Sequence, residues 1–239
     1  MEARLASESW TSAEERLRAA HAARPPRDPR RSWERWEHVF MMHDRERKLL
    51  KMLRRAGMMP LAGKQILEVG SGTGGVLREL IKWGATPECV TGVDVMPDAI
   101  EIARELLPSS VKLLCRNAAA LPFPDQSFDL VCQVTTFSSI FEPALKEKVA
   151  REMLRVVKPT GAILWCDLRL NNPKNPTVRG VGKNELNGLF PGYRFRLERI
   201  GPPAQLMRPL ARHSWMLAYL VAQIPWICTQ LLGVATTTT

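Results

Sequence analysis

The chain has 239 residues, of which 45% are hydrophobic and 24% charged, which excludes a disordered or fibrous protein and is enough for one globular domain. Much of its net charge of +10 comes from arginines before residue 60, where acidic residues are interleaved. We interpret this region as a solvated helical face; attraction to an anionic substrate or to nucleic acid is the alternative. No pattern of aromatic and basic residues marks nucleic acid as a specific partner.

The five cysteines are scattered singly, without a CxxC pair. We therefore expect reduced thiols, no disulfide framework and no metal site. The first residues lack the apolar stretch of a secretion signal, which predicts a cytoplasmic protein. Residues 214–239 carry no charge and are long enough to cross a bilayer. Because Pro225 and two glutamines interrupt this run, we expect buried core there and no transmembrane span.

The order of helical and strand-like patterns predicts the fold class. An Arg-, Ala- and Pro-rich arm occupies the first 32 residues, and an apolar stripe at helical spacing follows it up to Gly57. Amphipathic helices then alternate with apolar runs, and one of them is expected to bury Ala99, Ile102, Ala103 and Leu106. The turn Lys158-Pro159-Thr160-Gly161 is expected to close the helix before the fifth run. The predicted strands cover 65–69, 90–95, 111–115, 128–134 and 162–168, with an edge strand at 193–200.

Strands that alternate with helices in this way form a parallel sheet through right-handed crossovers. The strands are apolar along nearly their whole length, so the sheet must be covered on both faces. The predicted fold is a doubly wound, Rossmann-like α/β domain.

A glycine-rich turn follows the first predicted strand. Gly70, Gly72 and Gly75 would let the backbone approach a ligand where a Cβ would clash. This spacing alone also fits the dinucleotide site of an NAD(P) oxidoreductase. Glu68, however, suits a ligand with an ammonium group and would repel a pyrophosphate. Asp94, at the end of the second predicted strand, can accept hydrogen bonds from both ribose hydroxyls, as in NAD enzymes.

Further motifs distinguish between these readings. The Glu68-x-Gly70-x-Gly72 turn and Asp94 occur together with Leu-Pro-Phe-Pro-Asp-x-Ser-Phe-Asp-Leu-Val at 121–131 and Val-Lys-Pro-x-Gly at 157–161. The combination resembles the class I S-adenosylmethionine-dependent methyltransferases of the UbiE-like type, over about residues 45–200. The resemblance implies an enzyme that binds S-adenosyl-L-methionine, methylates a small-molecule acceptor and releases S-adenosyl-L-homocysteine.

The resemblance also implies which residues bind the cofactor. Glu68, Gly70 and Gly72 would contact the methionine moiety, and Asp94 the ribose. Asn117 stands where the family usually has an acidic residue, and its amide oxygen can still accept a hydrogen bond from the adenine amino group. The remaining implied contacts are Val95 and Met96 on the adenine ring, the Ala118 N–H beside it, and Gln133 at the methionine end.

The acceptor is expected beyond the carboxyl ends of the strands. Arg169 and Asn172, in the amide-rich loop after the fifth strand, are the expected acceptor-binding residues; simple turn formation is the alternative for this loop. We predict transfer to oxygen or nitrogen of a small molecule, with sugars and specialised metabolites as candidates. No catalytic residue is predicted, since an activated methyl group needs mainly an aligned acceptor.

The expected organisation is an N-terminal arm and helical lid at residues 1–58, followed by the methyltransferase domain at residues 59–239. The tail resembles methyltransferases of bacterial glycan and specialised-metabolite pathways, which implies a seven-stranded sheet with the last strand inserted antiparallel. Core or lid packing is expected for Trp33, Trp36, Trp215 and Trp226. A non-catalytic or regulatory protein that keeps the cofactor fold is the alternative function, and the chain is expected to be a monomer or a homodimer.

Overall fold

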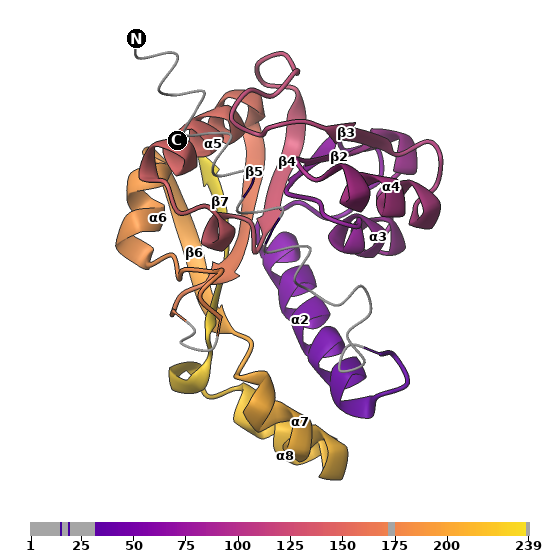
Figure 1. Ribbon diagram of the computed structural model, residues 1–239, viewed down its shortest axis with the longest axis vertical. Helices are drawn as coiled ribbons and strands as arrows, with labels where there is room; N and C mark the ends of the chain where they lie inside the picture. The colour runs from indigo at the N-terminus through magenta and orange to yellow at the C-terminus, as the bar shows by residue number, and fades with distance from the viewer. Residues whose placement is uncertain (1–14, 16–18, 20–31, 172–174, 238–239) are drawn as a thin grey trace.

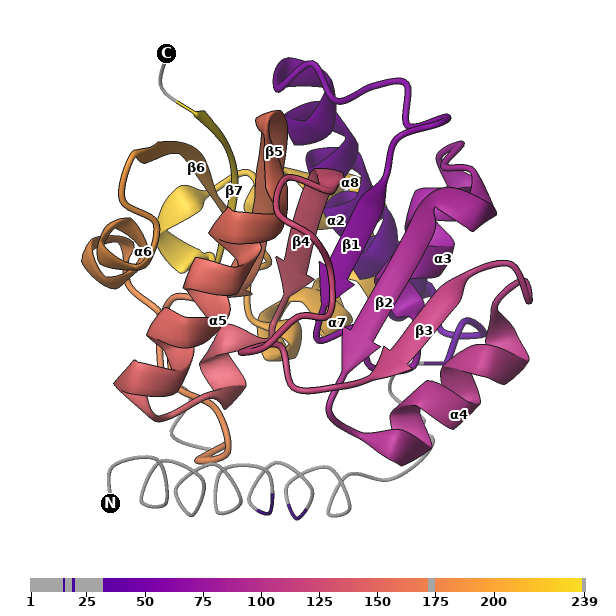
Figure 2. The same ribbon diagram turned by 90° about the horizontal axis from the view of Figure 1, so that it is seen from above.

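A computed structural model describes residues 15, 19, 32–171 and 175–237. Most of the predicted N-terminal arm, and Asn172, lie outside these residues. The described chain forms one sheet with helices on both faces (Figures 1 and 2). The strands are β1 (Ile66–Val69), β2 (Val90–Asp94), β3 (Lys112–Cys115), β4 (Phe128–Val134), β5 (Val157–Leu168), β6 (Tyr193–Ile200) and β7 (Gln230–Thr237). The α-helices are α2 (Trp36–Arg55), α3 (Gly75–Lys82), α4 (Pro97–Leu106), α5 (Pro143–Val156), α6 (Lys183–Leu189), α7 (Ala204–His213) and α8 (Trp215–Ala222).

The strand order is β3-β2-β1-β4-β5-β7-β6. The first five strands are parallel, and β7 runs antiparallel to both of its neighbours. This confirms the predicted seven-stranded sheet with the last strand inserted antiparallel. The carboxyl ends of β1, β2, β4 and β5 therefore meet at one edge of the sheet, where open α/β proteins bind their ligands.

Alternation along the central strands divides the core into two layers. Ile66 of β1 belongs to the layer under α2 and α3, whereas Leu67 belongs to the layer under α5 and α6. Because successive side chains of a strand point to opposite faces, Glu68 points toward α2 and α3. Gln133 of β4 follows the same rule and lies on the α5 side, since Cys132 belongs to the α2 and α3 layer.

Helix α4 differs from the prediction in its buried face. Ala99 and Ala103 are buried as expected, but Ile102 and Leu106 are 43% and 49% exposed, and Ile100 is buried instead. Successive helical residues are about 100° apart, so Ile100 and Ile102 point to nearly opposite sides, and only one of them can face the sheet.

The expected turn at 158–161 is also wrong. β5 begins at Val157, directly after α5, and passes through these residues. The register with β4 shifts there, from Phe128 opposite Val157 to Leu130 opposite Ala162. A bulge in β5 therefore accommodates the extra residues that the sequence pattern assigned to a turn.

The C-terminal segment is only partly buried. Leu232 and Val234 of β7 lie in the core, but the expectation of buried core is wrong for α8, where Met216 is 75% exposed and Leu220 57%. Among the residues that the structure describes, no helix is long and apolar enough to cross a membrane. Of the expected core or lid packing, core packing is wrong for Trp36, which is exposed; its edge-on contact with the Trp215 ring links α2 to α8. Trp33 and Trp226 are exposed as well.

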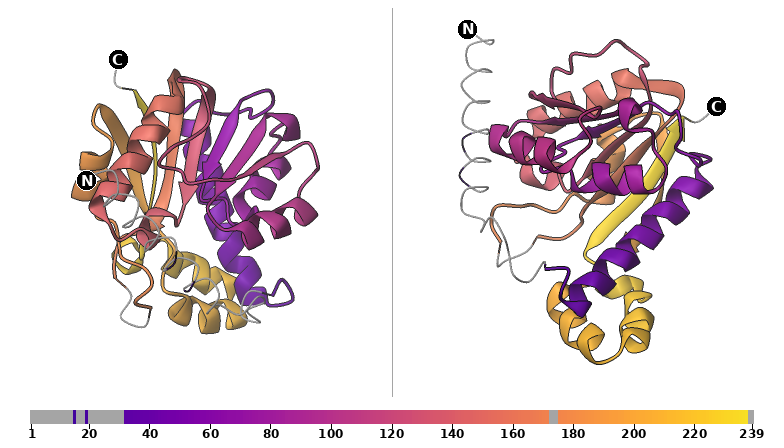
Figure 3. Two further views of the ribbon diagram at one scale, coloured as in Figure 1. Left: turned by 45° about the horizontal axis from the view of Figure 1, so that its top comes forward. Right: turned by 90° about the vertical axis from the view of Figure 1, so that its right-hand side faces the viewer.

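Helices α7 and α8 form a small helical unit with the start of α2. Phe40 of α2 packs with small buried residues of both helices in a separate apolar cluster. The Lys48 ammonium donates a hydrogen bond to the Ala222 carbonyl at 3.2 Å and pairs with Asp44 at 2.8 Å. Since this unit connects the carboxyl end of β6 to the start of β7, it lies at the ligand-binding edge of the sheet, and Figure 3 shows it projecting from the sheet beside α2.

Candidate functional site

The glycine-rich turn after β1 has its backbone in the left-handed region. Gly70 has φ +72° and Gly72 has φ +51°, a conformation that favours glycine. A Cβ on Gly70 would overlap the side chain of Thr136, whose hydroxyl donates to the Val69 carbonyl at 3.0 Å. Among the residues that the structure describes, a Cβ on Gly72 would meet nothing within 4 Å. Packing within the protein thus explains Gly70, whereas the space at Gly72 is open to a ligand.

Asp94 joins the turn to the loop after β2. One carboxylate oxygen accepts a hydrogen bond from the Gly72 N–H at 2.7 Å, and the other from the Met96 N–H at 2.9 Å. An ionised carboxylate offers about four acceptor positions, so both oxygens can still accept from ligand hydroxyls. Val95 is half-buried and Met96 is buried between Asp94 and α4. The structure therefore brings the residues predicted for ribose and adenine next to the glycine turn.

Glu68 is a buried acid with incomplete hydrogen bonding. Its side chain is 2% exposed. Burial raises the pKa of this carboxyl well above its usual range, and the nearby carboxylates of Asp94 and Glu79 add to the rise. The Arg45 guanidinium of α2 acts in the opposite direction. Within the described chain, Glu68 Oε2 has no hydrogen-bond partner.

Other buried polar atoms also lack partners among the described residues, and they include Ser71 Oγ and Gln133 Nε2 at the carboxyl ends of β1 and β4. Gln133 is fully buried, and its Oε1 accepts from the Thr136 N–H at 3.1 Å. A buried polar atom without a partner costs about 1–3 kcal/mol, and such atoms are rare without a functional reason. The acceptor on Glu68 fits an ammonium group and the donor on Ser71 fits a carboxylate, whereas Gln133 offers a donor on the opposite, α5 side of the sheet.

The loop after β4 contains features that the sequence did not reveal. Thr135 has φ +60°, an uncommon conformation for a β-branched residue, and its N–H donates to the Cys166 carbonyl at 2.7 Å. Strained residues of this kind concentrate at functional sites. No local motif marks Thr135, because the strain arises from its contact with β5.

Asp167 ends β5 on the α5 side and is fully buried. Burial raises the pKa of this carboxyl to about 6. Its oxygens accept hydrogen bonds from the Ser138 N–H at 3.1 Å and from the Leu168 N–H at 2.8 Å. These bonds hold the short 3-10 helix η3 (Phe137–Ser139) against β5, so Asp167 positions the loop after β4.

The predicted adenine contacts lie after β3. The Asn117 side-chain oxygen accepts from the Ala119 N–H at 3.0 Å, and Ala118 between them is half-buried. The Arg116 N–H donates to the Asp94 carbonyl at 2.9 Å. The residue before Asn117 is therefore hydrogen-bonded to Asp94, the predicted ribose-binding residue.

The loop after β5 is engaged mainly in local contacts. Arg169 Nε donates to the Cys228 carbonyl at 2.8 Å, which ties the loop to the segment before β7. The Asn171 side chain accepts from the Gly180 N–H at 2.8 Å, and Asn175 accepts from Thr177. The described amides thus fit the turn-forming alternative, and acceptor binding by Arg169 and Asn172 stays a prediction.

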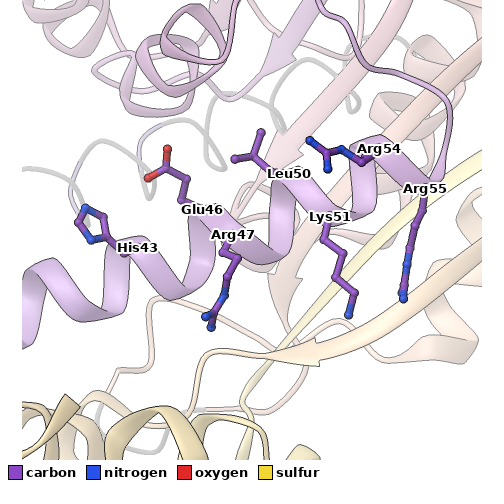
Figure 4. A pocket seen from close by; sticks show the side chains of 7 residues that line it. All are labelled: His43, Glu46, Arg47, Leu50, Lys51, Arg54 and Arg55. Atoms are coloured by element: carbon purple, nitrogen blue, oxygen red, sulfur yellow. The ribbon is translucent and has the colours of Figure 1, made fainter. Parts of the chain in front are cut away.

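Helix α2 covers the α3 side of the site. The Arg45 guanidinium pairs with Glu79 of α3, and Glu46 accepts from Lys82 and from the Trp83 indole, both at 2.7 Å. A groove of about 520 Å³ runs along α2, and Figure 4 shows Arg47, Lys51 and Arg55 on one side of the helix. The full lining is His43, Glu46, Arg47, Leu50, Lys51, Arg54 and Arg55.

Comparison with known proteins gives consistent results. Residues 66–161 match a family described as a methyltransferase domain. The chain is 40% identical over 108 residues to the 2-methyl-6-phytyl-1,4-hydroquinone methyltransferase of Synechocystis, covering 44% of this chain and 32% of that protein. It is 31% identical over 141 residues to the demethylmenaquinone methyltransferase of Tropheryma whipplei, covering 55% and 56% of the two chains. These matches span about a third to a half of the relatives' length.

Among solved structures, the PH0226 protein of Pyrococcus horikoshii OT3 superposes with a TM-score of 0.59 at 19% identity. The superposition covers 91% of this chain and 98% of the other. At this identity the likeness establishes the fold and leaves the reaction to be argued from the site.

Proposed function

We infer that this chain, which belongs to the class I S-adenosylmethionine-dependent methyltransferases over residues 66–161, methylates a small-molecule acceptor that carries an apolar group. The observation that carries the cofactor assignment is the buried Glu68 carboxyl, whose Oε2 has no hydrogen-bond partner among the described residues, on the strand that leads into the glycine turn. A pyrophosphate-containing cofactor would place negative charge against this acid, whereas an ammonium group would satisfy it.

The residues present fit the proposed cofactor. Glu68 would hold the ammonium, Ser71 the neighbouring carboxylate and Asp94 the ribose hydroxyls, and Gln133 would face the methionine end from the α5 side. Val95, Met96, Asn117 and Ala118 would surround the adenine. When bound, S-adenosylmethionine supplies a methyl group on a positively charged sulfur, which is already strongly electrophilic.

The chain's own contribution is then alignment and exclusion of water. Gly70 and Thr136 fix the turn, Asp167 fixes the loop after β4, and Arg45 links α2 to α3 above the buried acid. Holding two reactants in line can supply several kcal/mol of the barrier reduction without acid or base chemistry. We also propose residues 1–58 as an arm and lid, in which α2 would help to exclude water from the site.

The acceptor proposal rests on the two curated relatives, whose names specify a phytyl-substituted hydroquinone and demethylmenaquinone. We propose a hydroquinone-type acceptor with an apolar tail. Neither name is that of a sugar methyltransferase. We therefore add a ring carbon to oxygen and nitrogen as a third candidate for the methylated atom. The earlier candidates, a sugar or another specialised metabolite, would require polar contacts from Arg169 and Asn172.

The test is release of S-adenosylhomocysteine from purified full-length protein supplied with S-adenosylmethionine. Candidate acceptors are prenylated hydroquinones reduced in situ, their unprenylated counterparts, simple phenols and monosaccharides. Turnover with the prenylated hydroquinones above the others supports the proposal. Turnover only with sugars would contradict the acceptor class, and cofactor binding without any turnover would favour the regulatory alternative.

A further inference from the structure

The surface of α8 and of the short 3-10 helix η4 (Pro225–Ile227) is unusually apolar. Residues 215–226 contain no charged residue. Their exposed large side chains, which we call the apolar docking surface, are Trp215, Met216, Leu217, Tyr219, Leu220, Ile224 and Trp226. Met216 is 75% exposed and Trp226 is 79% exposed. Contiguous exposed apolar patches generally mark interaction sites.

Helix α8 is inverted relative to an ordinary amphipathic helix. Its small residues Ala218 and Ala222 are buried against Phe40, while its large side chains face outward. A helix that packs on a core normally buries its large apolar side chains and exposes polar ones. The small inward residues let α8 lie close to α2. Trp215 also packs edge-on against Phe40, but Met216, Leu217 and Leu220 remain exposed.

The charges of the segment that contains the apolar docking surface are positive. After Glu198 the chain contains no acidic residue, but it contains Arg208 and Arg212 in α7. The Arg47 guanidinium of α2, which also pairs with Asp44, lies over the Tyr219 ring, 4.6 Å from its centroid. Tryptophan and tyrosine beside arginine are typical of segments that lie in the interface of anionic membranes.

The geometry also distinguishes the interface from a membrane span and from self-association. Eight helical residues extend only ~12 Å, whereas the hydrocarbon core is about 30 Å thick. A two-fold dimer formed by this surface would place two identical patches together, so the arginines of α7 would find no acidic partner in the same segment of the other copy. An anionic bilayer instead complements both the apolar side chains and the cations next to them.

We propose that the apolar docking surface inserts into the interface of an anionic phospholipid membrane and holds the carboxyl edge of the sheet against it. The segment lies between β6 and β7 at that edge, so docking would bring the mouth of the site to the bilayer surface. The proposal stands independently of methyl transfer. Together with the proposed function, it gives an acceptor with an apolar tail a direct route from the membrane.

Flotation of the full-length protein with phosphatidylcholine vesicles, with and without phosphatidylglycerol, tests this. The wild type should float with the anionic vesicles, and the triple variant Met216→Ser, Leu220→Ser, Trp226→Ser should lower the partition coefficient at least tenfold. Arg212→Gln should lower it about fivefold, equivalent to ~1 kcal/mol per basic residue. The matched control replaces Ile102 and Leu106, exposed apolar residues of α4, by serine and should bind like the wild type.

Binding of S-adenosylhomocysteine, measured by calorimetry on the same variants, checks their folding separately from docking. Absence of wild-type flotation with anionic vesicles would overturn the proposal. The proposal would also be overturned if the wild type did not bind vesicles and formed a dimer in analytical ultracentrifugation while the triple variant was monomeric. That result would assign the surface to a second copy of the chain.

Discussion

Replacing Glu68 by glutamine keeps the size of the side chain and removes its ability to ionise. In the ligand-free protein, burial and the carboxylates of Asp94 and Glu79 raise the pKa of Glu68 well above its usual range. A ligand ammonium placed against the free Oε2 would stabilise the charged carboxylate. Cofactor binding should therefore release a proton from the wild type over the pH range in which Glu68 is protonated in the free protein.

The magnitude follows from the single unfilled oxygen on this carboxyl. A hydrogen bond to a charged group contributes about 1.5–3 kcal/mol, so Glu68→Gln should weaken binding of S-adenosylhomocysteine by about 10–150-fold above the pH at which Glu68 ionises in the free protein. The difference should narrow as pH falls, because the wild type must then give up a proton to bind.

As pH rises, the wild type should gain ligand affinity relative to Glu68→Gln, but its stability without ligand should fall relative to that variant. Because the pKa of Glu68 is raised on folding, the folded state binds more protons than the unfolded state above pH 4.5. The wild type should thus lose stability relative to Glu68→Gln as pH rises from 4.5. Calorimetric titrations in two buffers of different ionisation enthalpy measure both affinity and proton release. Equal affinity and equal proton release in the two proteins would refute the role assigned to Glu68.

Three further predictions concern residues around this acid. Gly72→Ala should reduce cofactor affinity at least tenfold by filling the open side of the turn. The control Gly63→Ala, also at positive φ with open space, should lose ~1 kcal/mol of stability, as Gly72→Ala should, but keep its affinity. Equal cofactor affinities of the two variants would contradict the assignment. Burial raises the pKa of Asp167 from 3.8 to about 6, so this carboxyl should reduce the free energy of unfolding by up to ~3 kcal/mol between those pH values; urea titrations at pH 4 and 7 should show a larger decrease in the wild type than in Asp167→Asn, which keeps only the contribution of Glu68. Arg169→Ala removes the hydrogen bond to the Cys228 carbonyl and should cost ~1 kcal/mol of stability; an unchanged melting temperature with a raised acceptor KM would instead support acceptor binding.

Much of the fold was readable from the sequence because its signals are local. The strands are nearly continuous apolar runs, and the glycine turn and Asp94 lie within 27 residues of each other along the chain, at 68–94. The same periodicity failed for α4, where Ile100 and Ile102 are chemically equivalent and only the position of the neighbouring sheet decides which one is buried. It also failed at 158–161, where pairing with β4 converts turn-like residues into a bulged strand.

The missed features of the site depend on contacts between distant segments. Arg45 becomes relevant only because α2 crosses α3, which brings its guanidinium to Glu79 and near Glu68. The strain at Thr135 and the burial of Asp167 likewise arise from packing against neighbouring elements. Helix α8 shows the same limit, since its apolar composition predicted burial although its alanines occupy the inward face.

The central claim is that the glycine turn, Glu68 and Asp94 form a site for S-adenosylmethionine. Isothermal titration of the wild type and of Asp94→Ala with S-adenosylmethionine, S-adenosylhomocysteine and NADH tests it most directly. The account predicts that the wild type binds both adenosyl ligands with one-to-one stoichiometry and does not bind NADH. Asp94→Ala should weaken adenosyl binding by about 1.5–3 kcal/mol. Binding of NADH in preference to the adenosyl ligands, or equal adenosyl affinity in the two proteins, would contradict it.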